Sequence, residues 1–175
     1  LGFNPILWAL CKEDVDSFKY HVLCRDDDES EFIRNHEDLK HVIVLTKDEI
    51  KDQEFDVTLA LDSYFTRYGT EDTQKQIIAD AHSYTRKALV TTIKDFKNMK
   101  SVDRLVDPPM VINSGEASHV FVCHRTWDRA DKQKFNETMY QLSNGKLISE
   151  VTEIKRTLYF KQLAKYIHDL GCSDF

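Results

Sequence analysis

Residues 136–165 read NETMYQLSNGKLISEVTEIKRTLYFKQLAK, and this stretch decides the fold that the sequence predicts. Asn144-Gly145 predicts a turn, and residues 146–155 alternate as a strand with two different faces does. The spacing then becomes helical, with a core stripe formed by Tyr159, Leu163, Tyr166, Ile167 and Leu170. Gly171 is a natural end for that helix. The stretch therefore predicts a sheet element followed by a packed helix.

The N-terminal third of the chain predicts helix, charged loop and strand in turn. Pro5–Leu23 has apolar residues at helical spacing, and Pro5 suits a first helical turn. Arg25–Glu31 is a charge run typical of a solvated loop. His41–Leu45 is β-branched and predicts a buried strand, whereas Phe55–Leu61 fits either a strand or the start of a helix.

The clearest helical pattern covers Thr70–Phe96. Thr70 or Thr73 can cap it, and acidic residues follow where the helix dipole favours negative charge. The apolar stripe of this pattern also carries His82, and it consists of Ile78, His82, Thr85, Leu89 and Ile93. By its position alone, His82 is more typical of a core residue than of a ligand.

Shorter elements are predicted between this helix and the 136–165 stretch. Ser101–Pro109 reads as a short helix that Asp103 caps, ending at the proline pair. Met110–Asn113 and His119–His124 predict two strands of a hairpin. Trp127–Leu142 is irregular, with helical character in its middle. These patterns predict an α+β fold in which a small mixed or antiparallel sheet packs with several helices.

Length and composition favour one compact domain covering residues 1–175. The chain has 175 residues, 41% of them hydrophobic, which is enough for a sizeable core. Within it we expect an N-terminal helical lobe at residues 1–65 and the core of the fold at residues 66–175. No apolar run is long enough to span a membrane, and five scattered glycines provide no phosphate-binding loop. We therefore expect no membrane association and no nucleotide cofactor.

Charge and cysteine usage narrow the classes of function. A net charge of −6 argues against a broad surface that coats nucleic acid, although bound metal ions would reverse the local sign at a nuclease site. The four cysteines form no CxxC pair, and the first residues resemble no secretory signal. We therefore expect a cytoplasmic protein with reduced thiols that is not secreted.

Two carboxylates bracket the Asn144-Gly145 turn and suggest chemistry. Glu137 precedes the turn, Glu150 follows it on the predicted strand, and Lys165 lies on the helix beyond. Carboxylates that hold divalent ions, with a lysine nearby, are the equipment of a metal-dependent phosphodiesterase. A buried Glu150 needs a partner, which is either a metal ion or a salt bridge. Lys165 flanks the core stripe and either reaches a cleft or faces solvent.

The stretch NETMYQLSNGKLISEVTEIK resembles the core of the cap-snatching endonucleases of segmented negative-strand RNA viruses, which occur in bunyavirus and arenavirus L proteins and in the influenza-type PA subunit. In that family an acidic residue in a PD-type turn is followed by a second acid on a strand, by Val-Thr and by a helical lysine. The segment around His82 is similar to the family's His-bearing helix. The resemblance covers about residues 77–170 and implies a PD-(D/E)xK-nuclease-like fold.

That resemblance implies an endoribonuclease that cleaves capped, single-stranded host RNA to make primers for viral transcription. Its cofactor would be Mn²⁺ or Mg²⁺ in a two-metal site, with Glu150 and Lys165 catalytic. Its partners would be single-stranded RNA and the remainder of a viral RNA polymerase, in the host cytoplasm, or in the nucleus if the chain is orthomyxovirus-like. The implied metal ligands are His82, Asp103, Glu137, Glu150 and the backbone carbonyl of Val151.

The sequence departs from the family pattern and leaves alternatives open. Asn136-Glu137 stands where the family has its PD pair, and Lys155 and Lys161 compete with Lys165 for the role of the lysine. The main alternative function is a non-catalytic α+β protein–protein interaction domain within a larger assembly. A third reading takes His168-Asp169 as the HD pair of a metal phosphohydrolase.

Overall fold

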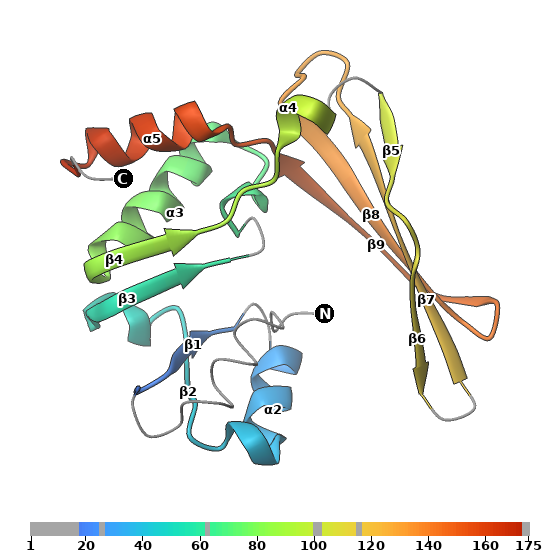
Figure 1. Ribbon diagram of the computed structural model, residues 1–175, viewed down its shortest axis with the longest axis horizontal. Coiled ribbons are helices and arrows are strands. Elements are labelled where there is room, and N and C mark those ends of the chain that lie inside the picture. Colours follow the sequence, from blue (N-terminus) through green and yellow to red (C-terminus); the bar gives the residue numbers. More distant parts are fainter. Residues whose placement is uncertain (1–17, 25–26, 62–63, 100–102, 115–116, 173–175) are drawn as a thin grey trace. The chain divides into compact units, whose positions relative to one another are not determined.

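The computed structural model describes residues 18–24, 27–61, 64–99, 103–114 and 117–172 (Figure 1). The chain divides into two compact units. One comprises the described residues within Leu1–Thr58 together with Ser83–Leu89, and the other those within Leu59–His82 and Val90–Phe175. The expectation of a single domain over residues 1–175, with an N-terminal lobe at residues 1–65, stays a prediction.

The first unit contains a parallel strand pair with a helical connection. Strand β1 (His21–Leu23) pairs in parallel with β2 (Ile43–Leu45), and His21 lies opposite Ile43. Parallel neighbours need a crossover connection, which here carries helix α2 (Asp27–Asn35) and the 3₁₀ helix η1 (Glu37–Leu39). Their core is formed by Ile33, Leu39 and Val42, with Tyr20, Val22, Cys24 and Val44 packed against it.

For this unit, one prediction is wrong in its described part, one is wrong, and one is confirmed. The helix expected over Pro5–Leu23 falls mostly outside the described residues, but its last part is strand β1. The expected loop at Arg25–Glu31 is helical from Asp27 onward, because acidic residues in a first turn are stabilised by the helix dipole. The strand expected within His41–Leu45 is confirmed as β2.

A second pair of strands also runs in one direction. Strand β3 (Phe55–Ala60) follows the 3₁₀ helix η2 (Glu49–Asp52), and β4 (Thr85–Thr91) is its neighbour in the sheet. The Phe55 amide donates to the Tyr84 carbonyl (2.7 Å), and the Thr92 amide donates to the Ala60 carbonyl (3.4 Å). Because the two starts and the two ends of the strands meet, β3 and β4 are parallel, as Figure 1 shows.

The long helix predicted for Thr70–Phe96 is correct only in its first half. After the 3₁₀ helix η3 (Tyr64–Thr66), helix α3 spans Glu71–Ser83, with Thr70 Oγ1 accepting a hydrogen bond from the Thr73 amide (3.2 Å). The chain then enters β4, whose composition, TRKALVT, includes the β-branched residues that favour strands. Thr85 and Leu89 fit a helical stripe and a strand equally well, because an apolar spacing of four residues occurs in both.

The second unit contains an antiparallel sheet in the order β5-β7-β8-β9, with β6 also paired to β7. The strands are β5 (Arg104–Val106), β6 (Met110–Ser114), β7 (Ala117–Trp127), β8 (Lys134–Ser143) and β9 (Lys146–Arg156). The β6–β7 hairpin and strand β9 confirm the sequence prediction. The turn at Asn144-Gly145 is confirmed as well, since both residues have positive φ (48° and 77°).

Two predictions in the second unit are wrong. The short helix expected in Ser101–Pro109 is strand β5 in its described part, paired with β7. The segment Trp127–Leu142, expected to be irregular or helical, ends β7 and forms most of β8. Strand β8 directs Phe135 and Glu137 to one face, and the charge at a half-buried position obscures the alternation that identifies strands.

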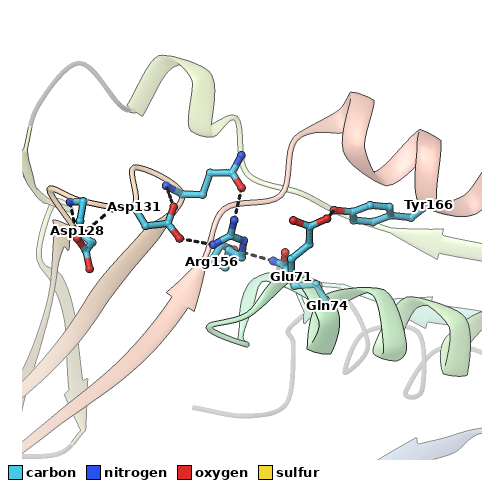
Figure 2. Close-up of polar contacts among 8 residues, drawn as sticks. Glu71, Gln74, Asp128, Asp131, Arg156 and Tyr166 are labelled. Atoms are coloured by element: carbon cyan, nitrogen blue, oxygen red, sulfur yellow. Dashed lines mark hydrogen bonds and ion pairs between the residues drawn. The ribbon is translucent and has the colours of Figure 1, made fainter.

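Helices α4 (Phe96–Met99) and α5 (Phe160–Asp169) complete the described elements. The final helix is confirmed, and Gly171 follows it at φ 92°, which a C-terminal stop requires. Figure 2 shows how α3 joins the end of β9: buried Gln74 donates to the carbonyl of Arg156 (3.0 Å). The Arg156 guanidinium in turn donates to Asp131 (2.6 Å).

The expectation of helices combined with a small sheet is confirmed at that level. The parallel β1–β2 and β3–β4 pairs, each with a helix in its connection, are α/β units that the sequence pattern did not predict. None of the described helices is long and apolar enough to cross a membrane.

Candidate functional site

An ionic cluster lies on one face of the antiparallel sheet, and Arg125 of β7 is its centre. Arg125 is paired across the strands with Glu137 of β8, and its Nε donates to Glu137 Oε2 (2.6 Å). Its Nη1 donates to Asp107 Oδ1 (2.6 Å), just beyond β5. Arg125 is only 2% exposed. Burial works against its charged form, but the hydrogen bond to Asp107 and the charge of Glu137 outweigh burial and raise the pKa of Arg125.

Lys155 of β9 completes the cluster from the other side. Its ammonium group pairs with Oε1 of Glu137 and, at 3.0 Å, with Glu153. Burial alone would raise the pKa of Glu137. The hydrogen bond and charge of Lys155, helped by the charges of Arg125 and Lys94, outweigh that effect and lower its pKa to about 2. Glu137 therefore stays a carboxylate throughout the physiological pH range.

Cys123 lies two residues before Arg125 on the same face of β7 and is buried. Burial raises the pKa of its thiol, the charge of Glu137 raises it further, and it reaches about 11. A thiol that keeps its proton at neutral pH is a poor nucleophile, so this cysteine is inert.

Aromatic side chains cover the end of the same face. Trp127 stacks on Phe135 with ring centroids 5.5 Å apart, and Phe96 of α4 lies 5.6 Å from Phe135. These buried rings form one core cluster with Met99, Leu105 and Tyr159 packed around it. The ionic cluster therefore lies next to buried apolar side chains. In such surroundings charges are screened less than in water, which strengthens the interactions between the charged groups of the cluster.

The predicted metal ligands do not converge in the described part of the chain. Glu137 has Arg125 and Lys155 as its polar partners. Glu150 is exposed and lies opposite Tyr140, and because strand faces alternate, it points away from the face that carries Glu137. Val151 is exposed beside it.

The other predicted site residues lie on separate elements. Asp103 precedes β5 and lies 3.8 Å from Lys132. His82 lies in the last turn of helix α3 and contacts Cys172, while Lys165 is exposed on α5. Among the described residues, no three His, Cys, Asp or Glu side chains are grouped so that they could hold a metal ion.

Sequence reasoning missed Arg125 and Asp107, and it named Lys155 only as a competitor of Lys165. The sequence does contain a signal. Cys123 and Trp127 flank Arg125 at a spacing of two residues, and Phe135 and Met139 flank Glu137 in the same way. A single charge on each of two apolar strand faces predicts a cross-strand ion pair, but only once both segments are recognised as strands.

The β1–β2 pair offers a second place for a ligand. In open α/β sheets, ligands bind beyond the carboxyl ends of parallel strands. After β1 the chain enters α2, whose first turn carries Asp27 and Asp28, both exposed. After β2, the amide and hydroxyl of Thr46 donate to Glu49 (2.8 and 2.9 Å) and fix that turn. Carboxylates at such an edge are suited to binding the hydroxyl groups of a ribose.

No family model and no curated protein matches the sequence. The fold, however, is similar to that of S-adenosylmethionine-dependent methyltransferases. The CcbJ methyltransferase from Streptomyces caelestis superposes with a TM-score of 0.68 at 15% identity, over 95% of this chain and 67% of that one. An S-adenosylmethionine-dependent methyltransferase from Clostridium acetobutylicum gives 0.66 at 11% identity, over 94% and 67%. The sugar N-methyltransferase KedS8 from a Streptoalloteichus species gives 0.60 at 9%, over 98% and 85%.

This likeness overturns the resemblance to cap-snatching endonucleases. The chain has a methyltransferase-like α/β fold and not a PD-(D/E)xK-nuclease-like core. The endonuclease activity and the Mn²⁺ or Mg²⁺ cofactor are therefore wrong as predictions, and the non-catalytic alternative gains no support. The short motif misled because Glu137 is already neutralised by Arg125 and Lys155, and because Glu150 lies on the opposite face. The expected partners and location stay predictions.

Proposed function

We propose that this chain provides the fold of an enzyme that transfers a methyl group from S-adenosylmethionine to a small acceptor. One observation carries the proposal: 95% of the chain superposes on a known methyltransferase with a TM-score of 0.68. Two further matching structures are also described as methyltransferases, and another is described as an S-adenosylmethionine complex of CalS10, an amino pentose methyltransferase.

The acidic residues beyond the carboxyl ends of β1 and β2, which we call the β1–β2 edge, suit the nucleoside half of that cofactor. Asp27 and Asp28 stand beyond the end of a parallel strand, where acidic side chains accept hydrogen bonds from ribose hydroxyls. Both are exposed and have charge to offer a ligand. When bound, S-adenosylmethionine supplies an electrophilic methyl group on its sulfonium. The role of these two residues is to bind and orient the ribose.

A thermal melt tests the proposal. S-adenosylhomocysteine should raise the melting temperature of the chain, because a ligand that binds only the folded state stabilises it by mass action. Replacing both acids, Asp27→Asn with Asp28→Asn, should remove most of that rise. The matched control is Asp52→Asn, an exposed acid at the end of η2, which should leave the rise unchanged.

Two results would count against the proposal. A melting temperature that S-adenosylhomocysteine leaves unchanged even at millimolar concentration would contradict binding of the cofactor. A rise that survives the double replacement would remove Asp27 and Asp28 from the site while leaving cofactor binding in place.

A further inference from the structure

A thiol and an imidazole meet where helices α3 and α5 end. Cys172 Sγ lies 2.9 Å from His82 Nε2, which is hydrogen-bond distance for this pair. His82 belongs to the last turn of α3, and Cys172 comes just after the C-terminal end of α5. Both side chains are partly exposed. A nucleophile within hydrogen-bond reach of a base is the arrangement that activates a cysteine.

The surrounding contacts hold the pair in place. Gly171, at φ 92°, reverses the chain after α5, and the Cys172 amide then donates to the Ile167 carbonyl (3.3 Å). Further along the two helices, the Tyr166 hydroxyl donates to Glu71 (3.0 Å). The two helices are therefore joined at both ends of their contact, as the side-by-side course of α3 and α5 in Figure 1 illustrates.

A groove also runs along the same two helices. It has a volume of about 300 Å³ and is lined by residues of α3 and of the end of α5: Asp72, Lys75, Gln76, Ala79, Tyr166, Asp169 and Leu170. Ala79 lies one turn before His82 on α3, so one wall of the groove is on the same side of the helix as the imidazole, although neither His82 nor Cys172 lines it.

We propose that Cys172 is a reactive thiol that hydroperoxides oxidise to a sulfenic acid, with His82 as the base that takes its proton. The thiolate is the reactive form of cysteine, and transfer of the thiol proton to Nε2 creates it. The sulfur then attacks one peroxide oxygen, so that an S–O bond forms and the O–O bond breaks. The departing oxygen takes the proton from the imidazolium and leaves as water or an alcohol. Sulfur loses two electrons, and the peroxide gains them.

The other described cysteines provide internal controls. Cys123 is buried and keeps its proton at neutral pH, since its pKa is about 11. Cys24 packs against the core cluster of the first unit. Site-selective oxidation at Cys172 follows from the imidazole beside it together with its partial exposure. This inference does not depend on methyl transfer.

The test is to treat the chain with hydrogen peroxide at pH 7, trap sulfenic acid with dimedone, and quantify each cysteine by mass spectrometry. We expect Cys172 to be labelled at least about tenfold faster than Cys24 or Cys123, because an unactivated thiol is only a few per cent thiolate at this pH. His82→Gln should slow Cys172 to the rate of Cys24. His168→Gln, an exposed histidine on α5, is the matched control and should change nothing.

Equal labelling of Cys172 and Cys24 in the wild type would overturn the proposal, and so would an unchanged Cys172 rate in His82→Gln. If His82→Gln lowers the melting temperature strongly, alkylation of the wild-type chain by iodoacetamide replaces the variant as the test. Cys172 must then react before the other two described cysteines, Cys24 and Cys123, and faster alkylation of either of these overturns the proposal.

Discussion

Replacing Glu137 with glutamine removes the carboxylate that joins Arg125 to Lys155. The pKa of Glu137 falls from the ordinary 4.5 to about 2 on folding. Because a change of one in the pKa is worth about 1.4 kcal/mol, the lowered pKa contributes about 3 kcal/mol to the free energy of unfolding at neutral pH. Removing one partner of a buried ion pair costs about 3–5 kcal/mol by mutational experience, which agrees. We therefore expect Glu137→Gln to lower the free energy of unfolding by about 3 kcal/mol at pH 7.

The pH dependence of that loss follows from the direction of the pKa shift. A carboxyl group whose pKa is lower in the folded state stabilises the fold above its unfolded pKa, and the contribution disappears as the pH falls through the folded pKa. The difference in stability between wild type and Glu137→Gln should therefore be constant above about pH 5 and should shrink between pH 4.5 and about 2.

Urea unfolding followed by circular dichroism at several pH values measures both effects. The matched control is Glu150→Gln, an exposed glutamate on the neighbouring strand, which should cost less than about 0.5 kcal/mol. The reasoning is refuted if Glu137→Gln costs no more than this control at pH 7, or if its cost stays constant down to pH 3.

Two further substitutions test how the second unit is held together. Gln74→Leu leaves the carbonyls of Phe65 and Arg156 without the donor they share, and unfolding in urea should show a loss of about 2 kcal/mol, whereas the exposed neighbour Gln76→Leu should cost less than about 0.5 kcal/mol. Gly145→Ala meets no atom within 4 Å but has φ at 77°, so backbone strain alone should cost about 1 kcal/mol in the same assay, and no loss at all would contradict the turn geometry.

Part of the fold follows directly from the sequence. The Asn144-Gly145 turn, strand β9 and helix α5 each have a period and a boundary residue that agree. Strand β4 was missed because its apolar spacing continues the helical stripe of α3, so local pattern could not show where the helix stops. The parallel strand pairs were missed for another reason: pairing between distant segments is set by tertiary contacts, which one strand's pattern does not contain.

The sequence indicates only part of the ionic cluster. Glu137 was singled out, but as a metal ligand, because a carboxylate at a half-buried position needs a positive partner and a metal ion is one such partner. The partners turned out to be Arg125 and Lys155 on the two neighbouring strands. Choosing between a cation and a cationic side chain requires the strand register, and the register was hidden while β8 read as irregular.

The most direct test of the proposed function is a calorimetric titration of the chain with S-adenosylmethionine, with MnCl₂ titrated in parallel. The methyltransferase-like fold and the acidic β1–β2 edge predict saturable binding of S-adenosylmethionine, weakened at least about tenfold in the Asp27→Asn, Asp28→Asn double variant. The proposed function would be contradicted if S-adenosylmethionine gave no heat of binding while Mn²⁺ bound saturably and Glu137→Gln abolished that Mn²⁺ binding.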